Sequence, residues 1–310
     1  MGTHVIAVVG ATATGKSRLA IELARAVDGE IVNADSMQLY QGMDIGTAKE
    51  PEPARQGVPH HLLGIWPVTQ AASVADYAKL ARAAIDEITA RGRVPVLAGG
   101  SGLYVRAALD DLDFPGTDAG IRARLEDDLA RRGPAAMHAR LAELDPAAAA
   151  AILPGNGRRI VRALEVVELS GRPFTATMPP YQQLRPAVQI GLTLPRPELD
   201  RRIADRVDGM WQAGLEAEVR RLVGEGLREG RTASRALGYQ QVLRYLDGAC
   251  TLEEARLDTI RATRRFARRQ ESWFRRDPRI TWLDAARSDQ ALVTRALRHI
   301  GTCIGVTAGP

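Results

Sequence analysis

Residues 5–17, VIAVVGATATGKS, decide the fold class of this 310-residue chain. The run at 5–9 is continuously apolar, as is typical of a strand buried on both faces of a parallel sheet. The next eight residues match the pattern GxxxxGK followed by Ser or Thr, and a helical pattern follows over 18–27. A strand before this pattern and a helix after it are the context in which it binds phosphate. The stretch therefore predicts a phosphate-binding loop, or P-loop, in an α/β sheet.

The groups of this loop suit a ligand that carries phosphate. Glycines let successive backbone amides turn inward around phosphate oxygens, and the helix N-terminus adds partial positive charge. The Lys16 ammonium neutralises phosphate charge, and the Ser17 hydroxyl is a candidate ligand of Mg2+. The predicted phosphate-binding residues are Gly10, Ala11, Thr12, Ala13, Thr14, Gly15, Lys16 and Ser17. A glycine turn that binds nothing is the alternative, and it leaves the complete motif unexplained.

Two further buried strands are predicted at 30–34 and 94–98. Asp35 follows the first, so its carboxylate projects from the sheet edge at which open α/β sheets bind ligands. Asp35 also suits the N-cap of a helix over 37–40, and the two roles are compatible. The second strand runs into glycines and Ser101, where many ATPases carry an aspartate that holds Mg2+. Ser101 is expected to cap the next helix or to contact substrate, and Asp35 is left as the best-placed carboxylate.

The pattern changes after residue 116 and is helical from about 118 to 172, without a convincing strand. Period-two alternation resumes at 188–194, and 280–284 is predicted to be a last short strand. We therefore expect an α/β fold, a P-loop NTPase-like parallel sheet core with a helical insertion domain. The expected parts are 1–114, the first part of the core; 115–187, the insertion; and 188–310, the second part of the core with a basic C-terminal helix.

The charge balance points weakly to a polyanionic partner. Lys+Arg number 42 against 37 Asp+Glu, for a net charge of +5. Only three of the basic residues are lysines, so codon bias toward arginine is a competing explanation. Residues 256–279 hold nine arginines and three acids, an excess that favours a phosphate backbone as the partner. A helical wheel places Arg261, Arg264, Arg265, Arg268 and Arg276 on one stripe, with Ile260, Phe266, Trp273 and Phe274 facing away.

Several classes of protein are disfavoured. Cys250 and Cys303 are too few for a disulfide framework and lack metal-ligand spacing. The adjacent His60 and His61 point to opposite sides of an extended segment, so we expect structural or substrate-lining roles rather than a shared metal. No apolar run reaches membrane-spanning length and no signal peptide is evident, so the expected compartment is the cytoplasm.

Seven motifs in order carry a more specific resemblance. They are GATATGKS at 10–17, NADSMQLYQGMDIGTAK at 33–49, VPHHL at 58–62, AGGSGLYV at 98–105, RRIVRALEV at 158–166, RALGYQQ at 235–241 and RRFARRQESWF at 264–274. Together the motifs resemble the bacterial tRNA dimethylallyltransferase family, also called tRNA isopentenyltransferases. The resemblance implies transfer of a dimethylallyl group from dimethylallyl diphosphate to the exocyclic amine of the adenine 3′ of the anticodon. The P-loop then holds a diphosphate leaving group, with Mg2+ as the cofactor.

The resemblance also implies roles for individual residues. Lys16, Ser17 and Asp35 are the expected catalytic residues, with Asp35 accepting a proton from the attacking amine. Arg202 or Arg206 assists the diphosphate, and the spacing does not choose between them. The expected contacts with the tRNA anticodon stem-loop are Asp35, Ser36, Met37, Gln38, Ser101, Arg122, Arg158, Arg159, Ile160, Val161 and Arg162, with Arg264 and Arg268 lining the RNA path. Many members have Pro where this chain has Ala11 and Thr where it has Ser101, and neither change removes a needed group. We expect a monomer with no membrane association.

Three other functions remain open at this point. A P-loop small-molecule kinase or NTPase shares the phosphate loop, Lys16 and Mg2+ but does not need the basic insertion. An adenylate isopentenyltransferase that modifies free nucleotides shares the core and has less use for an RNA-binding surface. A non-catalytic RNA-binding protein leaves the intact GKS sequence unexplained.

Overall fold

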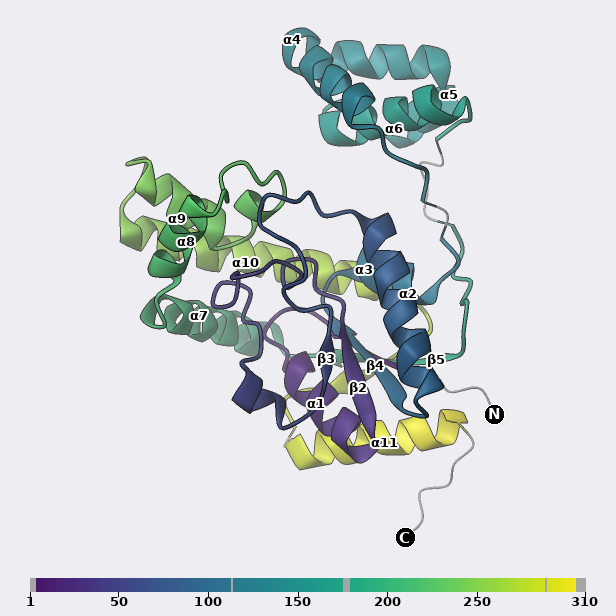
Figure 1. Ribbon diagram of the computed structural model, residues 1–310, viewed down its shortest axis with the longest axis vertical. Coiled ribbons are helices and arrows are strands. Elements are labelled where there is room, and N and C mark those ends of the chain that lie inside the picture. The colour runs from purple at the N-terminus through teal and green to yellow at the C-terminus, as the bar shows by residue number, and fades with distance from the viewer. Residues whose placement is uncertain (1–3, 113, 175–178, 288, 305–310) are drawn as a thin grey trace. The chain divides into compact units, whose positions relative to one another are not determined.

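The computed structural model describes residues 4–112, 114–174, 179–287 and 289–304 (Figure 1). The chain divides into two compact units. The first, here called the sheet unit, comprises Met1–Asp111 and Gln183–Pro310. The second, the helical unit, comprises Leu112–Gln182.

A six-stranded parallel sheet with the order β3-β2-β4-β1-β5-β6 forms the centre of the sheet unit. The α/β class with a parallel, P-loop-like core is therefore confirmed. Five strands match the predicted runs, whereas β3 was not predicted because two residues are too short to show periodicity. The strands are β1 Val5–Gly10, β2 Gly29–Asn33, β3 His60–His61, β4 Val94–Gly99, β5 Ala187–Thr193 and β6 Ile280–Asp284.

Helices cover this sheet because its central strands are apolar on both faces. Ile6 and Val8 of β1 join an apolar cluster with α1 and α11, while the alternating Ala7 and Val9 are equally buried toward the other face. The helices of the unit are α1 Lys16–Ala26, α2 Val74–Ala90, α3 Gly102–Leu109, α7 Arg196–Gln212, α8 Leu215–Gly224, α9 Tyr239–Leu246, α10 Leu252–Phe274 and α11 Asp289–Ile304, with short 3-10 helices at Glu52–Arg55 and Ala233–Arg235. Within the described ranges, no helix combines the length and the apolarity needed to cross a bilayer.

The helical unit contains α4 Ala119–Leu144, α5 Pro146–Ala151 and α6 Gly157–Ser170. The chain bends within α4 at Gly133, which has a φ of 77° and is followed by Pro134. Proline removes a backbone hydrogen-bond donor and restricts the conformation of the residue before it, so a regular helix cannot continue through this point. Asp118 accepts a hydrogen bond from the Ile121 amide at 2.8 Å and caps α4. Apolar side chains from all three helices form a separate core, which includes Leu125, Met137, Leu141, Ala148, Ile160 and Leu164.

Candidate functional site

A cavity of about 360 Å³ opens where β1, β2 and β4 end at their carboxyl edge. Its volume lies within the range of small-molecule sites, and its position is where α/β sheets bind ligands. The P-loop, the segment 35–38, the loop 46–50, α7 and α10 all contribute to its walls. Lys16, Ser17, Asp35 and Arg206 therefore meet at one cavity, which is the candidate active site.

Three residues of the P-loop have positive φ angles, which glycine adopts easily and alanine does not. Gly10 has a φ of 137°, and a Cβ there would lie 2.8 Å from the Leu192 carbonyl oxygen, so glycine is required. Ala13 has a φ of 63° and Gly15 one of 92°, which reverse the chain around its own amides. The Lys16 ammonium donates to the Ala11 carbonyl at 2.7 Å, so it lies folded over the loop.

Two cations, Lys16 and Arg206, line the cavity, and the charge of Arg206 acts on Lys16. Burial of the ammonium, and then the neighbouring Arg206 guanidinium, lower the pKa of Lys16 to about 8, while Asp35 acts in the opposite direction. Burial also lowers the pKa of Arg206, and the Asp35 and Glu50 carboxylates oppose that shift. Burial therefore disfavours the charged forms of Lys16 and Arg206, and a bound anion would favour them.

The structure distinguishes the two arginines that sequence spacing left equivalent. Arg206 lines the cavity beside Lys16 and Asp35, and its Nη2 donates to the Thr47 carbonyl at 3.5 Å. Arg202 forms an ion pair with Glu198 at 2.7 Å instead. Both arginines border a second hollow beside the P-loop, but of the two only Arg206 lines the cavity that contains Asp35. Arg206 is therefore the better placed to meet a diphosphate.

Asp35 is held by hydrogen bonds on both sides. Its amide donates to Asn33 Oδ1 at 2.9 Å, and Asn33 Nδ2 donates to the Asp35 carbonyl at 3.0 Å. One carboxylate oxygen accepts from the Met37 amide at 2.9 Å. The expected helix over 37–40 does not form, because this bond closes an Asx turn rather than an N-cap.

Ser101 joins the segment 35–38 to the strand β4. The Ser36 amide donates to Ser101 Oγ at 3.1 Å, and the two hydroxyls lie 3.3 Å apart. The Ser101 side chain makes no capping hydrogen bond to α3, so it does not cap that helix. Contact with substrate stays a prediction for Ser101. Asp35, Ser36, Met37 and Gln38 all line the cavity.

The inner side of α10 contributes cavity residues that sequence reasoning missed. Gln270 is buried, donates from Nε2 to the Gly100 carbonyl at 2.8 Å and accepts from the Thr12 amide at 2.9 Å. A Cβ on Gly100 would lie 2.4 Å from the Gln270 side-chain amide nitrogen, so glycine leaves room for this side chain. Phe266 lines the cavity rather than only packing behind the arginine stripe. A lone glutamine on the buried side of a basic helix was the signal available in the sequence. The residues of α10 that line the cavity are Thr259, Thr263, Phe266, Arg269 and Gln270.

The arginine stripe of α10 is shorter than predicted. Arg261, Arg265 and Arg268 are exposed. Arg264 is half-buried and donates from Nη2 to the Asp200 carbonyl of α7 at 3.1 Å, so it packs between helices. Arg276 lies beyond the end of the helix at Phe274.

Two of the predicted RNA-binding arginines of the helical unit pair with a buried acid. Glu165 is fully buried and receives hydrogen bonds from Arg122 and from Arg162, the latter at 2.8 Å. Burial tends to raise the pKa of Glu165, but these two guanidinium groups outweigh it and the net pKa is lowered. Arg158 and Arg159 are exposed.

Ile160 and Val161, which the resemblance placed at the RNA, are 0% and 4% exposed in the core of the helical unit. They pack with the apolar side chains of α4 and α5 in the same cluster. Their side chains have no surface to offer to RNA, so a contact through them is not supported. The amphipathic pattern of 160–164 already contained this information.

The two adjacent histidines point to different environments, as expected. His60 lines the cavity with Nδ1 2.8 Å from the Val58 carbonyl, and His61 contacts Glu30 at 2.6 Å. In the part of the chain that the structure describes, no three or more His, Cys, Asp or Glu side chains gather as a metal site.

Comparison with known proteins gives a consistent family. The model of the family described as IPP transferase matches residues 38–277. The chain is 68% identical over 297 residues to the tRNA dimethylallyltransferase of Thermobifida fusca, covering 94% of this chain and 92% of that protein. It is 66% identical over 292 residues to the tRNA dimethylallyltransferase of Streptomyces coelicolor, covering 94% of each chain.

Solved structures agree with this result. The full-length tRNA isopentenylpyrophosphate transferase of Bacillus halodurans is 40% identical, with a TM-score of 0.73, and the match covers 98% of this chain and 97% of that one. A eukaryotic dimethylallyltransferase acting on tRNA has a TM-score of 0.82 at 24% identity, covering 99% of this chain and 81% of that one, and supports the fold.

Proposed function

Because the chain belongs to the IPP transferase family, we propose that it transfers a dimethylallyl group from dimethylallyl diphosphate to tRNA. The acceptor is the exocyclic amine of the adenine 3′ of the anticodon, and the product is N6-isopentenyladenosine. The observation that carries this proposal is that Lys16, Arg206 and Asp35 line the same cavity. A cationic pocket for a leaving group thus adjoins a carboxylate that can receive a proton.

The phosphate end of the cavity suits the donor. The backbone turns of the P-loop, the ammonium of Lys16 and the guanidinium of Arg206 would contact the diphosphate. As the allylic carbon–oxygen bond breaks, negative charge grows on the leaving diphosphate. Partly desolvated cations stabilise that charge more strongly than exposed cations do, because the local dielectric is lower.

Asp35 suits the acceptor side of the reaction. The exocyclic amine of adenine is a poor nucleophile and must be oriented toward the allylic carbon. As the carbon–nitrogen bond forms, the amine proton passes to the Asp35 carboxylate, and diphosphate departs from the same carbon. A positioned base of this kind contributes about a hundred- to ten-thousand-fold to the rate.

Mg2+ fits this site with the donor bound. The cavity offers the Ser17 hydroxyl and the Asp35 carboxylate, and no cluster of three or more acids, histidines or cysteines occurs among the described residues. Mg2+ commonly takes one or two protein ligands and completes its shell with phosphate oxygens and water. Ser17 would hold the ion, which when bound supplies positive charge to the diphosphate.

The acceptor adenine has to leave its stack to reach the cavity. Proteins read unpaired loops of RNA by unstacking bases, and anticodon loops provide such bases. The exposed Arg158 and Arg159 of α6, and the exposed Arg268 of α10, are proposed contacts with the RNA backbone. A cytoplasmic location belongs to the proposal because the acceptor is tRNA.

One experiment with three acceptors tests the proposal. Purified protein is supplied with labelled dimethylallyl diphosphate, Mg2+ and either an anticodon stem-loop with two adjacent adenines or AMP. ATP with a small-molecule acceptor serves as the third arm. We expect label in the stem-loop. Label in AMP alone would indicate an adenylate isopentenyltransferase, and transfer of the γ-phosphate without prenylation would indicate a kinase.

A further inference from the structure

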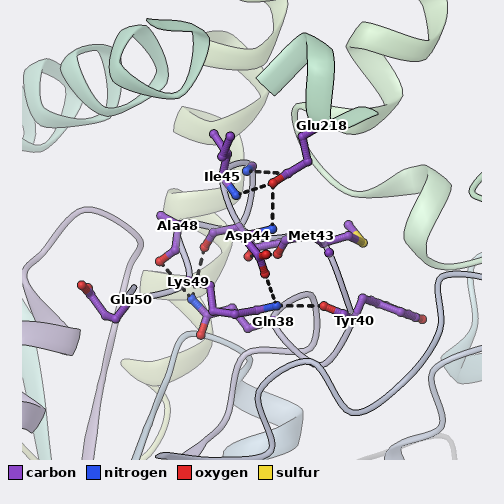
Figure 2. Close-up of polar contacts among 12 residues, drawn as sticks. Gln38, Tyr40, Met43, Asp44, Ile45, Ala48, Lys49, Glu50 and Glu218 are labelled. Carbon is purple, nitrogen blue, oxygen red and sulfur yellow. Dashed lines mark hydrogen bonds and ion pairs between the residues drawn. The ribbon is translucent and has the colours of Figure 1, made fainter. Parts of the chain in front are cut away.

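The loop 44–50, with the sequence DIGTAKE, forms a wall of the cavity but has no regular secondary structure (Figure 2). Gly46, Thr47 and Glu50 line the cavity. The loop bonds to itself in one turn, through the Ala48 and Lys49 amides. Such a turn does not by itself place the loop against the rest of the site, so other contacts must do so.

Glu218, in the first turn of α8, binds the beginning of this loop. Its carboxylate accepts hydrogen bonds from three consecutive amides, those of Asp44 at 3.0 Å, Ile45 at 2.7 Å and Gly46 at 3.1 Å (Figure 2). Glu218 is 7% exposed and does not line the cavity. A carboxylate on backbone amides forms charge-assisted bonds, which are stronger than neutral ones.

Tyr239 completes this contact from α9. Its hydroxyl donates to Glu218, because burial and then the Glu218 charge raise the pKa of the phenol and keep it protonated. The ring also packs on the loop: a Cβ on Gly46 would lie 2.4 Å from it. The loop therefore needs glycine at 46 in order to reach the carboxylate.

The far side of the same loop faces the reaction site. Gln38 Nε2 donates to the Thr47 carbonyl at 3.2 Å and to the Ala48 carbonyl at 3.3 Å. Arg206 Nη2 donates to the Thr47 carbonyl at 3.5 Å. Lys49 Nζ donates to the Tyr40 carbonyl at 2.9 Å, which joins the loop to the segment after Asp35 (Figure 2). The Thr47 carbonyl thus accepts hydrogen bonds from Gln38, on the acceptor side of the site, and from Arg206, on the donor side.

We propose that Glu218 is a positioning residue for the transfer reaction. By holding the amides of 44–46 it fixes the Thr47 carbonyl, and this carbonyl orients Gln38 on the acceptor side and Arg206 on the donor side. The inference rests on the proposed function for its reaction, but the loop contact itself does not. Without the carboxylate, three partly buried amides lose their acceptor and the loop moves to find water.

The test substitutes Glu218→Gln, which keeps the shape of the side chain. One of the two carboxylate oxygens becomes an NH2 group, which donates and cannot accept a hydrogen bond from a loop amide. The matched control is Glu216→Gln, in the same helical turn, whose carboxylate pairs with Arg220 and not with the loop. Two quantities are measured for each variant. One is the rate of hydrogen exchange in the peptide 43–50. The other is the pair of kcat and KM values for both substrates, with kcat calculated per functional donor-binding site.

We expect Glu218→Gln to speed exchange across 43–50 while α1 is unchanged, and to lower kcat/KM about tenfold to a hundredfold, in line with the cost of small misplacements. Tyr239→Phe, which leaves the carboxylate in place, should give a smaller effect of the same kind. Glu216→Gln should match the unsubstituted protein in both measurements.

Two results would overturn the proposal. One is faster exchange in the loop with unchanged kcat and KM per site, and the other is unchanged exchange in Glu218→Gln. If Glu218→Gln does not fold, Tyr239→Phe decides, and unchanged exchange and kinetics in that variant count against the proposal. Failure of the unsubstituted protein to prenylate any RNA would reject the proposed function instead, and loop exchange would still report on the Glu218 contact.

Discussion

Arg206 in the cavity of the sheet unit is partly buried, whereas Arg158 and Arg159 of the helical unit are exposed, and the two environments give them different roles. Arg206 lies in the cavity, where burial lowers its pKa and its field acts on Lys16. Arg158 and Arg159 lie exposed on α6. Charges in a partly desolvated cavity act strongly over short distances, whereas exposed charges are weakened by water and salt. Substitutions in the cavity should therefore change the rate, and substitutions on α6 should change RNA affinity and its dependence on salt.

The largest effect that sharpens this contrast should come from Arg206→Ala. Loss of a cation that stabilises developing charge costs about a hundred- to a thousandfold in kcat. Arg202→Ala is the matched control, because Arg202 forms an ion pair with Glu198 and does not line the cavity that contains Asp35. Steady-state kinetics with the stem-loop check both variants. Equal losses in the two would contradict the assignment of Arg206.

The pH dependence of Lys16 should give the next largest effect. Its pKa of about 8 in the ligand-free protein means that the ammonium is charged below pH 8 and neutral above it. We expect kcat/KM for the donor to fall as pH rises through 8, approaching about tenfold per pH unit. A pH profile of Lys16→Arg, which keeps its charge, should lack this fall even if its activity is lower. A flat profile for the unsubstituted protein up to pH 9.5 would argue against a charged Lys16 at the diphosphate.

The exposed arginines of the helical unit should change binding rather than chemistry. Replacing Arg158 and Arg159 by Ala should weaken stem-loop binding several-fold. The slope of log K against log salt concentration should also fall by the amount of up to about two phosphate contacts. Arg131→Ala is the control, because that exposed arginine pairs with Asp127 and Asp128 on its own helix. Fluorescence titrations at several salt concentrations measure both. An unchanged salt slope in the double variant would return these arginines to the codon-bias explanation.

The smallest effect should separate two arginines of α10. Arg268→Ala should lower RNA affinity by about the amount of one phosphate contact. Arg264→Ala should leave the salt slope unchanged and lower the melting temperature, because Arg264 donates to the Asp200 carbonyl between helices. Thermal unfolding and RNA titration on both variants check this. A change in salt slope for Arg264→Ala would show that this side chain reaches RNA after all.

Sequence reasoning predicted cavity-lining residues where neighbours in the chain contribute them. The P-loop, Lys16 and Ser17 follow directly on β1, so one stretch contains both the strand and its chemistry. Asp35 was found in the same way, because it follows a buried strand. The strands of a parallel sheet all end at one edge, which is why short local patterns predicted a shared cavity.

The remaining site residues act over long separations in the chain. Gln270 and Thr12 are 258 residues apart, and Glu218 and Asp44 are 174 apart, yet each pair shares a hydrogen bond. No local periodicity encodes such a pairing, so the position of Gln270 on its helix was a weak signal and its partner could not be predicted. Glu165 shows the same limit, since Arg122, 43 residues away, is one of its partners.

The central claim is that a leaving diphosphate and an RNA amine meet between Lys16 and Asp35. The most direct test is single-turnover prenyl transfer to the stem-loop by the unsubstituted protein and by Asp35→Asn, with RNA and donor binding measured on the same samples. We predict that binding of both substrates is retained while transfer slows about a hundred- to ten-thousandfold. Transfer at an unchanged rate in Asp35→Asn would contradict the account.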